Sequence, residues 1–185
     1  MRHRSGFSFR YAYGFVRDVL PRIETPYAAL TDRGSCYGFN QWRKLCERAG
    51  KKAIFGFEVA VTNNIGEKKP RRDYVTLIAL DGLTELHRVF GDSTSPLRKE
   101  PSLDYDQLNR IPQDKVAAII GRTILPELLD PEREWFYAQG PSTPPQIEQW
   151  AAEHGWKPIA SSDNTYPAPE DRHAFEILGG GRSGT

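Results

Sequence analysis

The sequence has few cysteines, no long apolar run and almost no excess charge. Its two cysteines, Cys36 and Cys46, show no CxxC spacing, which argues against a zinc knuckle and favours a reduced, cytoplasmic setting. No segment approaches the roughly 18 apolar residues of a membrane span. The basic N-terminus also lacks the apolar segment of a secretory signal. We therefore expect no membrane association.

The balance of charges gives no general argument for nucleic-acid binding. The net charge is +1 over 185 residues, so no long-range attraction to nucleic acid follows from composition. Hydrophobic residues make up 38% of the chain and charged residues 26%, which is ordinary for a globular protein and argues against gross disorder. We expect a single domain over residues 1–178 and a flexible, glycine-rich tail over residues 179–185.

The stretch from Tyr27 to Val61 has the pattern of a strand, a helix and a second strand. Tyr27–Thr31 is a short apolar run that ends at Asp32. After it, apolar residues recur at steps of three and four up to Gly50, which predicts an amphipathic helix. Ala53–Val61 is a second apolar run, with Glu58 as its one acidic residue. Such a βαβ unit implies a parallel sheet.

The rest of the chain continues this alternation of strands and helices. Strand patterns lie at 74–80, 116–120, 135–137 and 156–160, and helix patterns at 83–90, 103–111, 144–155 and 169–178. The sequence therefore predicts the α/β class.

Two segments allow both a structural and a nucleic-acid interpretation. From Phe7 to Phe15 aromatic residues alternate with small or basic ones, which predicts an opening strand; a stacking platform for bases is the alternative. Lys68, Lys69, Arg71 and Arg72 form the densest positive patch. The patch is either part of a solvated loop or a contact for phosphate backbone.

Acidic residues recur at or near predicted strand ends. Asp32, Glu58 and Asp163 would converge on one rim of the sheet, and three carboxylates suit a hard cation such as Mg²⁺ or Mn²⁺. Zinc is less favoured, because the four histidines show no pairing typical of imidazole ligands. They are His3, His87, His154 and His173.

Four segments in order resemble one known family. They are ALTDRGSCYGF, AGKKAIFGFEV, YVTLIALDGLTELHRVF and KPIASSDNTYPAPEDRHAFEIL. Together they resemble the PHP (polymerase and histidinol phosphatase) domain that opens bacterial DNA polymerase III alpha subunits. The resemblance covers residues 7 to 178 and implies a distorted seven-stranded β/α barrel in a single domain, with a metal site at its C-terminal rim.

The departures from the family pattern fall on the metal ligands. The region that corresponds to the family's H-x-H pair, residues 8–11, has no histidine. Arg33, Tyr74 and Thr165 stand where the family has its other histidines. Only Asp32, Glu58 and Asp163 keep ligand chemistry, which argues against hydrolysis of phosphoesters, since a multinuclear site needs several first-shell bonds to each ion.

A charge argument leads to a specific hypothesis about this rim. Three carboxylates repel each other unless a cation compensates them. We expect the guanidinium of Arg33, Arg10 or both to occupy the metal volume, because arginine binds carboxylate bidentately and keeps its charge. The alternative is that Arg33 points into solvent and the carboxylates are spread apart. On the first interpretation no cofactor is expected; any ion that binds should be Mg²⁺ or Mn²⁺.

Two functions from different classes remain open. The leading one is a catalytically degenerate PHP domain, a structural or interaction module of a replicative DNA polymerase. Its partner would be the polymerase core or another replisome protein, with a weak DNA contact. The alternative is a metal-dependent phosphoesterase or 3′–5′ exonuclease that uses the remaining carboxylates.

No palm domain follows in the sequence given, so we expect either a separately encoded domain, for instance a viral one, or a fragment of a polymerase. Partner binding would require exposed aromatics, for which the candidates are Tyr11, Tyr13, Trp135 and Tyr137.

Overall fold

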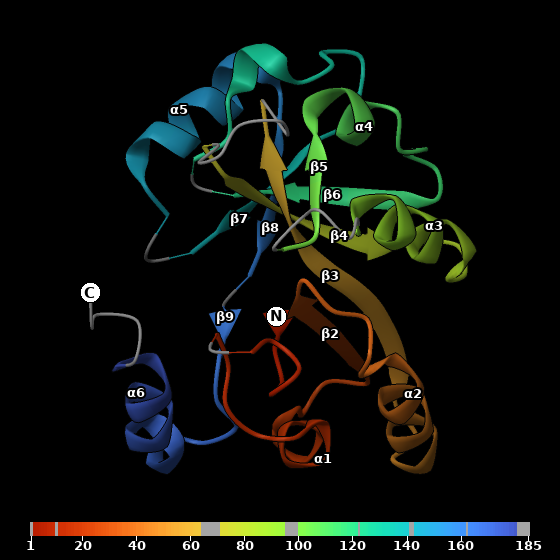
Figure 1. Ribbon diagram of the computed structural model, residues 1–185, viewed down its shortest axis with the longest axis vertical. Coiled ribbons are helices and arrows are strands. Elements are labelled where there is room, and N and C mark those ends of the chain that lie inside the picture. Colours follow the sequence, from red (N-terminus) through yellow and green to blue (C-terminus); the bar gives the residue numbers. More distant parts are fainter. Residues whose placement is uncertain are drawn as a thin grey trace. The chain divides into compact units, whose positions relative to one another are not determined.

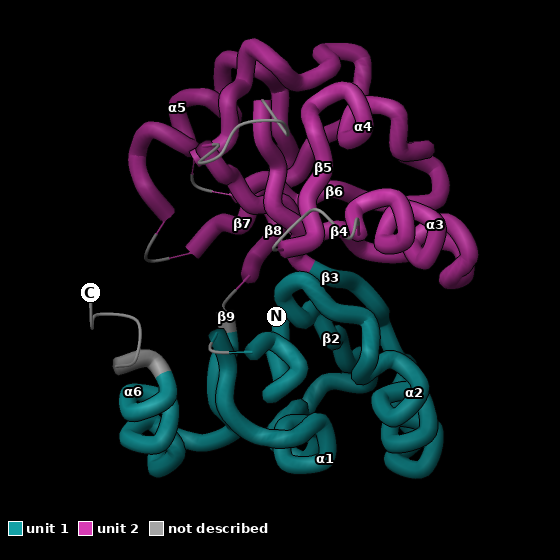
Figure 2. The backbone as a smooth tube through the Cα atoms, viewed as in Figure 1, with its two compact units in different colours: residues 1–57, 162–185 teal, residues 58–161 magenta. Residues whose placement is uncertain are grey.

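The backbone falls into two compact units (Figure 2). Unit 1 comprises residues 1–57 and 162–185, and unit 2 comprises residues 58–161. The computed structural model describes residues 2–9, 11–63, 71–94, 100–121, 123–140, 143–161 and 163–180. Among these residues, no helix has the length and apolar content that crossing a bilayer requires.

Unit 1 pairs the first strand of the chain with the last one. Its strands are β1 (Arg2–His3), β2 (Tyr27–Arg33), the first half of β3 (Lys52–Thr62) and β9 (Asp163–Asn164). Strand β1 lies between β2 and β9 and is parallel to both (Figure 1). Its helical segments are α1 (Val16–Val19), η1 (Leu20–Arg22), α2 (Phe39–Arg48), η3 (Pro169–Asp171) and α6 (Arg172–Gly180).

Helix α2 shows why the central part of unit 1 folds as its pattern predicts. Phe39, Trp42 and Cys46 share one face and are buried, while charged residues fill the other face. The indole Nε1 of Trp42 donates a hydrogen bond of 3.1 Å to the carbonyl oxygen of Ala28 on β2. Gly50 follows the helix with a φ of 64°, a left-handed conformation that glycine adopts without strain. The predicted strand–helix–strand order is confirmed.

Unit 2 contains the second half of β3 and five further strands. These are β4 (Asp73–Ala79), β5 (Ser102–Asp104), β6 (Val116–Ile120), β7 (Phe136–Gln139) and β8 (Lys157–Ala160). The order across the sheet is β8-β7-β6-β4-β3, and β5 pairs with β3. The helical segments are α3 (Thr84–Ser93), α4 (Tyr105–Asn109), η2 (Pro126–Leu128) and α5 (Pro145–His154).

The sheet contains an antiparallel pair of strands as well as parallel ones. Strands β6 and β7, β7 and β8, and β3 and β5 pair in parallel, whereas β4 and β6 are antiparallel. Strand β4 lies beside β6, which runs in the opposite direction, and β5 pairs with β3. The α/β class is confirmed, and this mostly parallel pairing is consistent with a distorted β/α barrel.

The predicted opening strand at residues 7–15 is wrong. The first strand, β1, lies upstream, and the amide nitrogen of Ser8 donates to the carbonyl oxygen of Ser5 in the first of several consecutive turns. The amides of Tyr11 and Ala12 in turn donate to the carbonyl oxygen of Ser8. The alternation of aromatic with small or basic residues suggested a half-buried strand, but Phe9 is 76% exposed and does not pack in a sheet. At the other end of the chain, α6 runs to Gly180, and residues 181–185 of the predicted tail lie outside the described residues.

Candidate functional site

Asp32 lies at the C-terminal end of β2, completely buried. Its Oδ1 accepts hydrogen bonds from the Ser5 amide (2.6 Å) and the Ser8 hydroxyl (2.7 Å). The Ser5 hydroxyl lies 2.9 Å from Oδ2 and 3.1 Å from Oδ1. The carboxylate is thus satisfied by donors from the turn that follows β1, as a buried charged group requires.

The neighbouring backbone closes the remaining side of this carboxylate. A Cβ added at Gly38 would lie 3.3 Å from Oδ2 of Asp32 and 2.9 Å from Cδ2 of Leu30. Glycine at the start of α2 therefore lets the helix approach the end of β2 closely without displacing the Leu30 side chain.

Arg33 is held by the same turn. Its amide donates a hydrogen bond of 2.9 Å to the Ser8 hydroxyl, which itself donates to Asp32. Its guanidinium lies over the ring of Tyr11, with 3.7 Å between the guanidinium carbon and the ring centroid. Stacking of this kind suits the planar, permanently charged guanidinium. The predicted pairing of Arg33 with a rim carboxylate stays a prediction, and Arg10 lies outside the described residues.

Burial dominates the titration behaviour around Asp32. Loss of solvent raises the pKa of Asp32, while the hydrogen bonds from Ser5 and Ser8 and the charge of Arg4 act in the opposite direction. Burial, with the Asp32 carboxylate as a lesser cause, raises the pKa of Cys36 to about 12. The Cys36 thiol therefore stays protonated at neutral pH and is a poor nucleophile.

His3 is a buried neutral base on β1, and not a surface residue. It is 5% exposed, and burial lowers its pKa from 6.5 to about 4. Its Nδ1 lies 3.1 Å from the side-chain nitrogen of Asn164. The side-chain nitrogen of Asn164 can only donate a hydrogen bond. The Nδ1 atom of His3 therefore accepts it, and the proton of the neutral ring is on Nε2. The hydroxyl of Thr31 donates to the carbonyl oxygen of His3 (3.3 Å).

The other two predicted carboxylates occupy separate elements. Glu58 lies within β3, 7% exposed, at the first position of unit 2. Asp163 opens β9 opposite Arg2, and its side chain is outside the described part of the structure.

The strand register separates the backbones of Asp32 and Asp163. Leu30 is level with His3, and Asp163 is level with Arg2. Asp32 is two residues past Leu30, so it lies three residues beyond Asp163 along the strands, or about 10 Å. The metal-binding trio stays a prediction.

The described residues do not fit a metal centre. No group of three His, Cys, Asp or Glu side chains among them could hold an ion. The Asp32 carboxylate already accepts hydrogen bonds from the Ser5 amide and from the Ser5 and Ser8 hydroxyls, so donors of the protein itself compensate it. No chemical step through a metal follows from this arrangement.

The predicted basic patch is only partly described. Lys68 and Lys69 lie outside the described residues. Arg71 donates to Oδ1 of Asp73 (3.4 Å) and to the carbonyl oxygen of Thr123 (2.6 Å). Arg72 forms an ion pair of 2.9 Å with Glu100. Both arginines therefore have partners within the protein, and the predicted phosphate contact remains a prediction.

The residues that our sequence reasoning missed are Arg4, Ser5 and Ser8. It assigned the lost histidine pair to residues 8–11, because it expected the first strand too far downstream. A usable signal was the spacing of the two serines, since hydroxyls three residues apart in one turn can reach the same acceptor.

Comparison with known proteins supports the fold and leaves the family open. No model of a known protein family matches the chain, and no curated protein matches it. A protein from Bifidobacterium adolescentis, assigned as a metal-dependent phosphoesterase, is similar in structure with a TM-score of 0.60 at 11% sequence identity. An amidohydrolase from Chromobacterium violaceum, solved with bound sulfate and no metal, is similar with a TM-score of 0.62 at 12% identity. Each match covers 96% of this chain and 95% of the other.

Identities this low establish a shared fold and nothing finer. The fold is shared with a protein assigned as a metal-dependent phosphoesterase and with an amidohydrolase.

Proposed function

We propose that this chain is a catalytically degenerate PHP-like domain that acts as a structural or interaction module. The observation that carries the proposal is the internal hydrogen bonding of Asp32, which is fully buried and accepts hydrogen bonds from the Ser5 amide and both serine hydroxyls. A carboxylate bound in this way stabilises the end of β2 and the turn after β1. Its role in the protein is to hold the fold together.

The partner we propose is a replicative DNA polymerase core or another replisome protein, in the cytoplasm. The family resemblance suggests this partner, and unit 1 has exposed aromatic residues as candidates for the contact: Phe9, Phe15 and Tyr37 are 76%, 63% and 77% exposed. Aromatic residues are enriched at protein interfaces. Trp135 and Tyr137 are 3% and 7% exposed, so the expectation that they contribute to such a surface is wrong.

Incubation with single-stranded DNA and Mn²⁺ tests the proposal against the enzymatic alternative. We expect no product that depends on Asp32 or Glu58. Product formation by the native chain that disappears in both Asp32→Ala and Glu58→Ala would establish a metal-dependent nuclease and overturn the proposal. Asp106→Ala is the control, because this side chain is 83% exposed on α4.

A weak contact with DNA is a separate part of the proposal. Replacing Lys68, Lys69, Arg71 and Arg72 by alanine should flatten the dependence of DNA affinity on salt, because fewer counterions are released on binding. A salt dependence identical to that of the native chain would exclude this patch as the DNA contact.

A further inference from the structure

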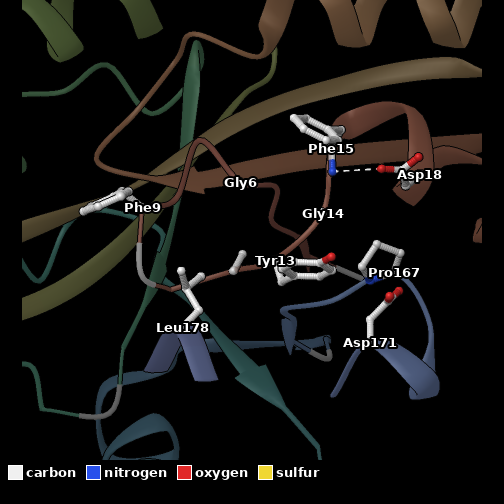
Figure 3. Close-up of a pocket in the computed structure, with 10 residues that line it drawn as sticks. Gly6, Phe9, Tyr13, Gly14, Phe15, Asp18, Pro167, Asp171 and Leu178 are labelled. Atoms are coloured by element: carbon white, nitrogen blue, oxygen red, sulfur yellow. Dashed lines mark hydrogen bonds between the residues drawn. The ribbon is translucent and has the colours of Figure 1, made fainter. Parts of the chain in front are cut away.

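Unit 1 contains an open cavity of about 340 Å³ (Figure 3). One wall is formed by the loop between Gly6 and Phe15, and the other by the segment between Pro167 and Leu178. The volume is in the lower part of the range for small-molecule pockets.

Aromatic rings supply much of the lining. Phe9, Tyr13 and Phe15 are 76%, 38% and 63% exposed, and Figure 3 shows these three side chains with Leu178 at the cavity. Ala12, only 1% exposed, also lines it. Three large aromatic side chains within seven residues are thus exposed to solvent. Exposed apolar side chains that lie close together are typical of a binding surface.

Backbone contacts hold the two walls in place. The backbone amide of Tyr13 donates a hydrogen bond to the carbonyl oxygen of Thr165 (2.8 Å), and the backbone amide of Gly6 donates one to the carbonyl oxygen of Gly14 (2.6 Å). Gly14 has a φ of 96°, and a Cβ there would lie 2.5 Å from Cγ of Pro167. The loop and the C-terminal segment are thus fixed at this point, so the cavity exists without a ligand and binding would require little reordering.

Two carboxylates complete the lining. Oδ2 of Asp18 accepts from the amide of Phe15 (3.1 Å), and Oδ2 of Asp171 accepts from the amide of Ala168 (3.2 Å). Each carboxylate is thereby held at the start of a helical segment. Nε of Arg17 lies 3.8 Å from Oδ1 of Asp18 on the exposed side. None of the described residues that line the cavity carries a positive charge.

One ring of the cavity already accommodates a cation. The guanidinium carbon of Arg17 lies 4.8 Å from the centroid of the Phe15 ring, within the range of a cation–π interaction. The aromatic faces carry a negative quadrupole and the carboxylates a full negative charge. The lining is therefore complementary to a positive ligand and repels an anion.

We propose that this cavity binds a small organic cation, a protonated or quaternary amine with an apolar body. The ammonium group would lie between the aromatic faces and the carboxylates of Asp18 and Asp171, and the apolar body against Leu178 and Pro167. This inference shares Phe9 and Phe15 with the contact surface proposed above, but it uses none of the groups around Asp32 that carry the proposed function.

Two probes of equal size test the charge requirement. Benzyltrimethylammonium is a cation, and N-benzylacetamide is uncharged with the same number of non-hydrogen atoms. Titration of the ¹⁵N-labelled full chain should shift amide resonances of residues 6–15 and 168–178. The cation should bind at least about threefold more tightly. Equal affinities, or shifts confined to other parts of the chain, would overturn the proposal.

Variants then assign the binding to this cavity. Asp171→Asn keeps an oxygen for the amide of Ala168 and removes only the charge, so the affinity for the cation should fall about two- to fivefold. Tyr13→Leu should have a similar effect through loss of a ring face. Asp106→Asn, the same change on exposed α4, should leave the affinity unchanged. Far-UV circular dichroism checks that each variant is folded. Unchanged affinity in both folded cavity variants would refute the proposal.

Discussion

Replacing Asp32 by alanine should destabilise the protein, and the structure sets the size of the effect. The change removes the acceptor of the Ser5 amide and of the Ser8 hydroxyl. Both serines are fully buried, so water cannot replace the lost partner. A buried donor left without an acceptor costs about 1–3 kcal/mol, so the gross loss is about 2–6 kcal/mol.

Part of this loss is offset, because burial raises the pKa of Asp32. The raised pKa means that desolvation of the charged carboxylate opposes folding, and alanine removes that cost. We therefore expect a net loss of about 2–4 kcal/mol in the free energy of unfolding. Asp32→Asn keeps an acceptor for the Ser5 amide and a donor for the Ser5 hydroxyl. The free energy of unfolding of Asp32→Asn should therefore be only about 1 kcal/mol lower than that of the native chain.

Urea denaturation at neutral pH measures these differences. The midpoint of Asp32→Ala should fall by about 1–2 M with an unchanged slope. Asp106→Ala, an exposed control on α4, should change the free energy of unfolding by less than about 0.5 kcal/mol. An Asp32→Ala variant as stable as the native chain, or more stable, would refute the reasoning. It would indicate a carboxylate kept free for a ligand at the expense of stability.

Two further perturbations test the surroundings of this carboxylate. Because the pKa of His3 is lowered to about 4, the unfolded chain binds the extra proton between pH 4 and 6.5. The contribution of His3 to the free energy of unfolding should therefore be fully present above pH 6.5. The free energy of unfolding should decline as the pH falls towards 4, by up to about 1.4 kcal/mol per pH unit. Urea denaturation of His3→Gln across this range should show a shallower decline. Gly38→Ala should cost about 1–3 kcal/mol through overlap with Leu30 and Asp32. Gly91→Ala, in α3 with open space at Cβ, should instead stabilise by about 0.5–1 kcal/mol; equal effects of the two glycine changes would contradict the close approach at Gly38.

Local periodicity was sufficient to predict much of the fold. The helix from Phe39 and the strands on either side of it follow from apolar spacing, because burial of one face depends on residues close in sequence. The strand at 116–120 and the helix that begins near Pro144 were also predictable for this reason.

Pairing between distant segments was not predictable in the same way. Asp32 was singled out as a candidate ligand from its place after a strand. Its actual partners, Ser5 and Ser8, are 27 and 24 residues away, and nothing in local spacing indicates a hydrogen bond across that separation. The antiparallel pairing of β4 with β6 joins segments that periodicity alone does not connect. The prediction of an opening strand at residues 7–15 was wrong because alternation of aromatic residues also occurs in an exposed loop.

Calorimetric titration of the purified chain with Mn²⁺ is the most direct test of the central claim that the site around Asp32 is closed by the protein's own donors. The account predicts no stoichiometric heat of binding, and the same trace for the native chain and for Asp32→Asn. Tight binding of one or more ions per chain that is lost in Asp32→Asn would contradict it.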